Sequence, residues 1–225
     1  MMASEKKPSE LYPQVAECEK RLKDFIQEIL DVGKEMLSVG GGKLYTHDMF
    51  FIGALNRSID LIDAILILTS RWNFVAAAPL IRLHLDTLLR LSYWRTIKNP
   101  DAFIRQILEG KQVNQIKDEE GIKLTEGRLR EYTRSIFPQV DNVYKETSRL
   151  IHFSDKHVFT CIEALDETGR MAGFSIGKGS SRWREKDILN LLECAITITE
   201  AILSIGRGWV LEKVQIEQSN GCKND

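Results

Sequence analysis

The sequence predicts an all-α bundle of six or seven helices, with a small β-hairpin at about residues 157–176 before a long C-terminal helix. Over most of the chain, apolar residues recur at the three- to four-residue spacing of amphipathic helices. Glycine and proline interrupt this spacing at 40–42, 99–100 and 137–138, where helices are expected to end. One late segment instead has the β-branched and aromatic composition of strands.

The expected helices have recognisable beginnings and ends. The first stops at the triglycine 40–42, and the second begins at Thr46 or Asp48, either of which can cap a helix. In the third, Pro79 lies close enough to the start to be tolerated, and Pro100 begins the next helix. The expected helices span residues 12–37, 46–70, 73–98, 101–117, 125–136, 139–153 and 182–214.

The hairpin is expected where the composition changes. Residues 157–164 are rich in valine, phenylalanine, threonine and isoleucine, and residues 171–176 are apolar and alternating. The Asp-Glu-Thr-Gly-Arg run at 166–170 has the composition of a turn. We therefore expect two antiparallel strands, followed by a loop to Ser181, which can cap the last helix.

Length and composition indicate one globular domain. The chain has 225 residues, of which 43% are hydrophobic and 28% charged. Its formal net charge of -1 gives no global signal for nucleic acid, DNA included, or for an anionic membrane, and leaves a local basic patch open. We expect a disordered tail at 1–10, a single helical domain at 11–217 and a loose tail at 218–225. The polar N-terminus has no apolar signal region, and Arg57 and Asp60 interrupt the most apolar stretch, so we expect a cytoplasmic protein.

Several common chemistries are excluded. The four cysteines form no C-x-x-C pair, and the chain contains no H-E-x-x-H zinc helix, no G-x-G-x-x-G dinucleotide turn and no G-x-S-x-G nucleophile elbow. The run from Gly173 to Gly179 is one residue short of a phosphate loop and has glycine where the magnesium-binding hydroxyl belongs. His84 stands alone on its side of the third helix and is expected to be structural. We expect neither a metal nor a cofactor.

Polar residues on the two central helices each follow a single stripe. Arg82 and Asp86 are four residues apart in the third helix, and Asn56 and Asp60 are four apart in the second. One interpretation is two solvated faces with ion pairs inside each helix. The other is a buried network, in which Arg82 needs Asp86 or Asp60 as a partner and also meets His152. The members of that buried cluster would be Asn56, Asp60, Arg82, Asp86, Tyr144 and Ser148.

The helix expected at 139–153 provides a candidate catalytic pair. Tyr144, Ser148 and His152 share one face, and Arg149 lies one turn before His152 on the adjoining face. Guanidinium binds phosphate through two hydrogen bonds and imidazole titrates near neutrality, so Arg149 and His152 could combine phosphate binding with acid–base chemistry. The alternative is a His152 that only forms a hydrogen bond at the end of its helix.

These residues resemble a bacterial all-helical family of unknown function. The match covers about residues 46–157 and rests on the Arg-x-x-x-Asp helix and on the later Tyr, Ser and His positions given above. Such families are grouped with HEPN domains, which are helical bundles, often dimeric, and many act in phage defence or toxin–antitoxin systems. Several of them cleave RNA through an Arg-x(4–6)-His motif. Here two residues separate Arg149 from His152, and Asp86 stands where the family tends to have Glu.

The resemblance implies a HEPN-like domain of a bacterial defence or toxin–antitoxin type system that binds RNA. If the chain is an enzyme, the resemblance implies a metal-independent ribonuclease that uses Arg149 and His152. Two alternatives stay open: a non-enzymatic homodimeric interaction protein, or a bundle that binds a small ligand between its central helices. A homodimer is also expected because one domain is not expected to cover both the first helix and the apolar residues of the last helix between Ile188 and Ile202.

Overall fold

The computed structural model describes residues 6–151, 162–165, 172–174 and 183–221. These residues are almost entirely helical, and the only sheet among them is a pair of short strands, which confirms the predicted all-α fold. The elements are α1 (Pro8–Leu11), α2 (Pro13–Ser38), η1 (Val39–Gly42), α3 (Thr46–Ser70), α4 (Phe74–Thr96), α5 (Pro100–Leu108), η2 (Val113–Gln115), α6 (Glu126–Arg134), α7 (Val140–Ile151), β1 (Ile162–Leu165), β2 (Ala172–Phe174) and α9 (Glu185–Gly221).

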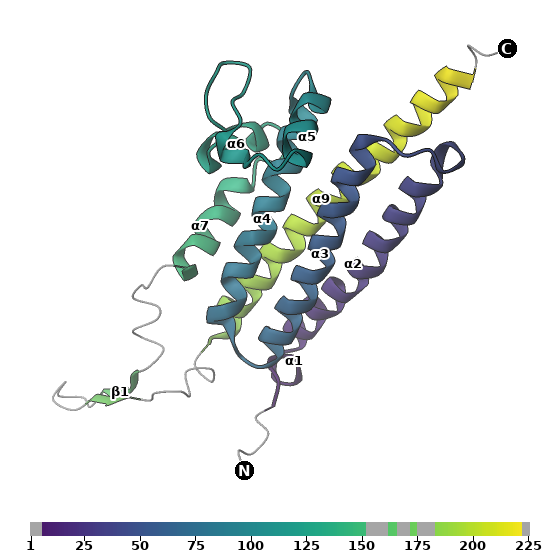
Figure 1. Cartoon of the computed structure of the whole chain (residues 1–225). Helices are drawn as coiled ribbons and strands as arrows, with labels where there is room; N and C mark the ends of the chain where they lie inside the picture. Colours follow the sequence, from purple (N-terminus) through teal and green to yellow (C-terminus); the bar gives the residue numbers. More distant parts are fainter. Residues whose placement is uncertain (1–5, 152–161, 166–171, 175–182, 222–225) are drawn as a thin grey trace.

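Four long helices, α2, α3, α4 and α9, form the body of the molecule (Figure 1). α2 packs against α3 and α9, and α4 packs against α3 and α9. The other side of α4 is covered by α6 and α7, while α5 packs against α3 and α4. Because α4 has neighbours on so many sides, it is apolar around most of its circumference. Its fully buried residues include Ile81, Leu85, Leu88, Leu89 and Leu91.

Helix boundaries differ from the expected ones at both ends of the chain. α1 begins inside the segment expected to be a disordered tail, and Trp72 Nε1 donates a hydrogen bond of 2.9 Å to the carbonyl oxygen of Lys6. α9 continues to Gly221, through half of the segment expected to be a loose tail.

One helix in the middle of the chain is shorter than expected. α5 ends at Leu108 rather than near 117, and Gly110 follows it with a positive φ of 83°, typical of a helix terminus.

The hairpin before α9 is confirmed in a shorter form. β1 and β2 are antiparallel, with Ile162 opposite Phe174 and Leu165 opposite Ala172. The outer ends of the expected strands and the turn at 166–170 lie outside the described residues.

α9 is covered by other helices of the same chain. The apolar residues that led us to expect a homodimer are buried, and they are Ile188, Leu191, Leu192, Ala195, Ile198 and Ile202. Their burial removes the reason for that expectation, and dimerisation stays a prediction. In the described part of the chain, α9 alone is long and apolar enough to cross a membrane, but more than half of its most apolar window is buried, which is compatible with a soluble protein.

A buried ion pair lies where α2, α3 and α9 meet. The side chains of Lys213 in α9 and Asp48 in α3 are 0% and 1% exposed, and Lys213 Nζ lies 2.8 Å from Asp48 Oδ2. Lys213 also donates to the carbonyl oxygen of Met36 in α2 (2.7 Å), and Trp209 Nε1 donates to Asp48 Oδ1 (2.8 Å). A lysine is almost never fully buried without such partners, so these bonds fix α9 against both neighbours.

The triglycine next to this ion pair does more than end the first helix. Gly40 has a φ of +70°, and a Cβ at this position would lie 2.8 Å from the side chain of Glu217. Glu217 accepts hydrogen bonds from Lys43 Nζ (2.9 Å) and from the Tyr45 hydroxyl. Gly40 therefore provides both the left-handed turn and the space for α9 to approach η1.

Breaking the buried ion pair should destabilise the fold strongly. In Asp48→Asn the Lys213 ammonium stays buried without its counter-charge, so we expect the free energy of unfolding, measured by urea denaturation, to fall by about 3–5 kcal/mol. The double variant Asp48→Asn/Lys213→Met removes the unpaired charge and should recover a large part of that loss. A loss below about 1 kcal/mol in the single variant, as for an exposed pair, would contradict the structural role of the pair.

His84 is a fully buried residue held by α9. Its Nε2 lies 2.9 Å from the hydroxyl of Thr199, which itself donates to the carbonyl oxygen of Ala195 (2.8 Å). The imidazole must therefore carry its proton on Nε2, which leaves Nδ1 buried with no hydrogen-bond partner among the described residues. Burial, helped by the charge of Arg57, lowers the pKa of His84 to about 3, because a second proton on the ring would be neither solvated nor bonded.

The stability of the fold should depend on pH, because burial lowers the pKa of His84. Its folded pKa lies below the ordinary value of 6.5, so the unfolded chain binds a proton that the folded chain excludes, and stability is lost as pH falls from 6.5 towards 3. Between about pH 6.5 and 5 this loss should approach ~1.4 kcal/mol per pH unit, and chemical denaturation of His84→Gln should give a smaller slope. His47, whose pKa burial also lowers, is present in both proteins and cancels in the comparison. If the unfolding free energy of the parent and of His84→Gln changed equally with pH, the lowered pKa of His84 would be refuted.

Candidate functional site

Two arginines from different helices lie on the ring of Tyr144 in α7. The guanidinium carbon of Arg82, from α4, is 3.9 Å from the ring centroid, and that of Arg130, from α6, is 3.8 Å away. The side chains of Arg82 and Arg130 are only 14% and 25% exposed. Cation–π contacts hold the two guanidinium groups on the ring, so side chains of α4, α6 and α7 are in contact here. We call Arg82, Arg130 and Tyr144 the arginine–tyrosine cluster.

The carboxylate partner of Arg82 differs from the two that the sequence suggested. Arg82 Nη2 is ion-paired with Glu126 Oε1 at the start of α6, where Asp86 or Asp60 was expected. The reason is that α6 packs directly on α4, whereas Asp60 is exposed on α3. Burial, with a further contribution from the charge of Arg130, lowers the pKa of Arg82 despite the opposing contributions of Tyr144 and Asp86. Arginine nevertheless stays charged at neutral pH.

Asp86 makes its ion pairs one turn further along α4. It is paired with Arg90 of the same helix and lies 3.8 Å from Arg57 Nη2 of α3. The side chains of Asp86, Arg90 and Arg57 are 29%, 33% and 47% exposed. Partly exposed pairs of this kind stabilise a fold little, but their arginines are accessible to a charged ligand.

Arginines and carboxylates share the ion pairs of this face. In the described part of the chain, Arg57, Arg82, Arg90, Arg130 and Arg134 share the carboxylates of Asp86, Glu126 and Asp141, and Arg128 of α6 is paired with Asp118, Glu120 and Glu131. The six arginines meet six carboxylates, so the face has no net surplus of charge. Its capacity to bind an anion is that of the individual guanidinium groups, which bind oxyanions through paired hydrogen bonds.

Some of the predicted site residues come together and others do not. Arg82 and Tyr144 meet, as predicted, and Asp86 lies one turn away on the same helix. Asn56 and Asp60 are exposed on α3, where Asn56 Nδ2 donates to Asp60 over 3.4 Å, so their prediction as buried residues is wrong. They face solvent because α3 turns its apolar residues towards α2 and α4.

The remaining predicted residues lie on or after α7. Ser148 is half-buried, one turn after Tyr144. Arg149 belongs to the same helix, but its side chain lies outside what the structure describes, as does His152. The candidate catalytic pair therefore stays a prediction.

A groove of about 410 Å³ opens beside the arginine–tyrosine cluster. Asp86 and Arg90 of α4 and Glu126 of α6 line it, together with the loop that joins α5 to α6. We expected a ligand site, if any, between α3 and α4, and this groove lies between α4 and α6. Buried apolar side chains, Ile62 and Leu85 among them, occupy the packed sides of α3 and α4.

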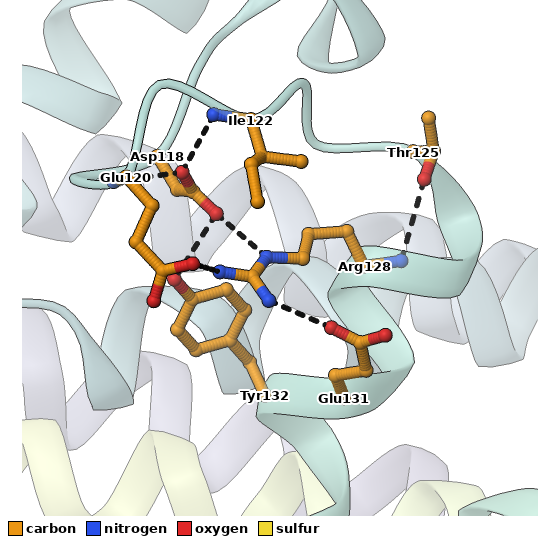
Figure 2. Close-up of polar contacts among 7 residues, drawn as sticks. All are labelled: Asp118, Glu120, Ile122, Thr125, Arg128, Glu131 and Tyr132. Atoms are coloured by element: carbon orange, nitrogen blue, oxygen red, sulfur yellow. Dashed lines mark hydrogen bonds and ion pairs between the residues drawn. The ribbon is translucent and has the colours of Figure 1, made fainter.

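A network of hydrogen bonds fixes the loop that forms one wall of the groove (Figure 2). The Asp118 side chain is 0% exposed and accepts bonds from the backbone N–H groups of Glu120 (3.0 Å) and Ile122 (2.9 Å). It also accepts from Arg128 Nε of α6 (2.6 Å) and from the Tyr132 hydroxyl (3.3 Å). Burial alone would raise the pKa of Asp118, but the bonds from Arg128 and the backbone outweigh it and lower the pKa.

Sequence analysis missed two members of this site, Arg130 and Glu126. They are four residues apart on a short polar helix, which looks like an ordinary exposed ion pair. Only the packing of α6 on α4 brings them to Arg82 and Tyr144. Lys213 did have a signal in the sequence, because it lies four residues after Trp209 on the buried stripe of α9.

Comparison of the chain with protein-family models, with curated proteins and with solved structures gave no match. Among the described residues, no group of three or more His, Cys, Asp or Glu side chains is placed to hold a metal ion. The candidate site can therefore do what arginine side chains do, which is to bind oxyanions through paired hydrogen bonds and to stack on planar groups.

Replacing Asp118 should loosen the loop in a pH-dependent manner. The folded pKa of Asp118 is lowered, so its contribution to stability is full above the ordinary aspartate value of about 3.9 and is lost as pH falls through the folded value. We therefore expect Asp118→Asn to be less stable than the parent at neutral pH, and the difference in urea denaturation to shrink towards acid pH. Glu120→Gln, which removes a 66% exposed partner of Arg128, is the matched control and should change little. A difference that does not vary with pH would contradict this role.

Proposed function

We propose that this chain is a HEPN-like domain of a bacterial defence or toxin–antitoxin type system, and that it binds single-stranded RNA on the face of α4, α6 and α7. The observation that carries the proposal is the pair of arginines, Arg82 and Arg130, held on the ring of Tyr144, with Arg57, Arg90 and Arg134 in the ion pairs beside them. RNA is a polyanion, and phosphate contacts from arginine provide much of the affinity of proteins that bind it. Because the chain is nearly neutral and carboxylates match the arginines of this face, binding would depend on individual guanidinium contacts rather than on general charge attraction.

The arginines of this face divide into two groups by exposure. Arg57, Arg90 and Arg134 are the more exposed, at 47%, 33% and 49%, and in the proposal they contact phosphates directly. Arg82 and Arg130 are held on Tyr144, so they are positioned before the RNA arrives and lose little side-chain freedom on binding. Guanidinium planes held in this way also provide surfaces on which unpaired bases stack.

Cleavage is the second part of the proposal. Arg149 follows Tyr144 by five positions in α7, and His152 comes three residues later. In the proposal Arg149 binds the scissile phosphate and His152 acts as the acid–base group, without a metal. This part rests on the sequence and on the resemblance, while RNA binding rests on the geometry of the arginine–tyrosine cluster.

The two alternative functions have less support in the described residues. A homodimeric interaction protein was expected from the apolar face of the last helix, and that face is buried within the chain. A small ligand between α3 and α4 was expected from Asp60, which is exposed. Among the described residues, RNA binding is supported by the arginines held on Tyr144, whereas the two features that suggested the alternatives are not found where they were expected.

The proposal predicts salt-dependent binding of RNA. A fluorescein-labelled single strand of about twelve nucleotides should increase in fluorescence anisotropy on titration with the protein, with an affinity that falls as salt rises. Arg57→Gln and Arg90→Gln should each weaken binding of all sequences and reduce the slope of log affinity against log salt by about one. His152→Ala should leave binding intact and abolish any cleavage of the strand.

Arg207→Gln is the matched control for these variants. Arg207 is 53% exposed and paired with Glu28, which makes it similar to Arg57 in exposure and pairing, but it lies on α9 at the α2 side. Its replacement should leave RNA binding unchanged. The proposal fails if the parent protein does not bind the strand, or if Arg207→Gln weakens binding as much as Arg90→Gln.

A further inference from the structure

The groove beside the arginine–tyrosine cluster has a different chemistry from the cluster itself. Three of its lining residues, Asp86, Arg90 and Glu126, are charged, and they pair with one another or with Arg57 and Arg82. The other lining residues are uncharged; they are Gln112, Val113, Asn114, Leu124 and Leu129. Of these, Gln112 and Asn114 are exposed, whereas Leu124 and Leu129 are buried. The groove therefore combines charged side chains of α4 and α6 with uncharged ones.

Two side-chain amides in the groove are free to bind a ligand. In the part of the chain that the structure describes, neither Gln112 nor Asn114 forms a side-chain hydrogen bond. Both residues are exposed. The amides of Asn73 and Asn99, in contrast, accept hydrogen bonds from backbone N–H groups at the starts of α4 and α5, at 3.2 and 3.1 Å. An amide presents both a donor and an acceptor, which is the combination that hydrogen-bonding edges of nucleobases require.

Apolar side chains complete the interior. Leu124 and Leu129 are 1% and 3% exposed, and Val113 is half-buried between the two amides in sequence. Val113 has surface with which to contact the face of a flat, uncharged group, and the buried leucines beneath make this part of the groove apolar, so it cannot solvate a second phosphate. The volume of about 410 Å³ is within the range of sites for small organic molecules, so one base with its sugar fits.

Backbone hydrogen bonds fix the segment that carries the amides and the turn that follows it. In η2, Gln115 N donates to the carbonyl oxygen of Gln112 (2.9 Å) and Ile116 N to that of Val113 (3.0 Å). In the turn, Leu124 N donates to the carbonyl oxygen of Ile116 (2.9 Å), and Lys117 and Lys123 form an antiparallel bridge. Asp118 closes the turn between them and ties it to Arg128 of α6, as Figure 2 shows. A wall fixed in this way loses little freedom on binding, which favours recognition of one shape.

We propose that this groove binds one unpaired nucleobase of the RNA, with Gln112 and Asn114 hydrogen-bonded to its edge. The inference rests on the function proposed above and names what the same face recognises beyond phosphate. Arg57, Arg82 and Arg90, beside the groove, contact the RNA phosphates on either side of that nucleotide, and the amides of Gln112 and Asn114 select its base. The chain therefore prefers some sequences of single-stranded RNA over others.

The test separates base recognition from phosphate binding. Labelled homopolymers of uridine, cytidine and adenosine, and a strand of the same length with abasic positions, are titrated with the parent protein. We expect affinities that differ by about tenfold between the best homopolymer and the abasic strand, the lower end of what paired hydrogen bonds to a base provide. Free mononucleotides should compete poorly, because they lack the neighbouring phosphates.

Variants then assign the preference to the groove. The double variant Gln112→Ala/Asn114→Ala should bind all strands with nearly equal affinity while its salt dependence stays that of the parent. Val113→Trp, which fills the groove, should do the same, and Gln218→Ala, an exposed amide on α9, should change nothing.

Three outcomes overturn the inference. If the parent binds RNA but all strands equally, the groove does not read a base, while the proposed function stands. If the double variant keeps the preference of the parent, another part of the chain selects the base. If no strand binds, or mononucleotides bind as tightly as the strands, the proposed function itself fails and the groove inference fails with it.

Discussion

A lysine ammonium buried between three helices constrains the rest of this structure. Lys213 reaches the carbonyl oxygen of Met36 at the end of α2 and the carboxylate of Asp48 at the start of α3, and it has no exposed surface. A charge in that position is tolerated only where its partners are in place, so α9 can take only one axial position against α2 and α3. The contact of Glu217 with Tyr45 and the close approach at Gly40 follow from that position.

With α9 in place, α4 becomes the helix on which the candidate site is built. One side of α4 packs on α3 and α9, where His84 bonds Thr199. Its other side carries Arg82, Asp86 and Arg90, and is covered by α6 and α7. α4 thus separates an apolar core that holds the bundle together from a polar interface in which arginines are held by an aromatic ring. Because the apolar side of α4 holds the bundle together, its other side can carry charged residues without loss of the core.

The loop between α5 and α6 links stability to the proposed function. Asp118 binds this loop to Arg128, and Tyr132 of the same helix packs edge-on against Tyr93 of α4 at 4.9 Å. The same contacts therefore position Glu126 and Arg130 for the arginine–tyrosine cluster and the amides of Gln112 and Asn114 for the groove. A change at Asp118 should disturb both, whereas a change at Asp48 should act on stability alone.

The sequence by itself determined the helical class, the main helix boundaries, the hairpin before α9 and the structural role of His84. These follow from spacing along one helix or strand, which local patterns record directly. It also placed Arg82 and Tyr144 in one site, because each interrupts an apolar surface. Only the tertiary structure decided that Glu126, and neither Asp86 nor Asp60, neutralises Arg82, and that Asn56 and Asp60 face solvent. The physical reason is that helical periodicity gives the direction of a side chain around its own axis, while the partner it meets depends on which helix packs across that axis, here α6 on α4.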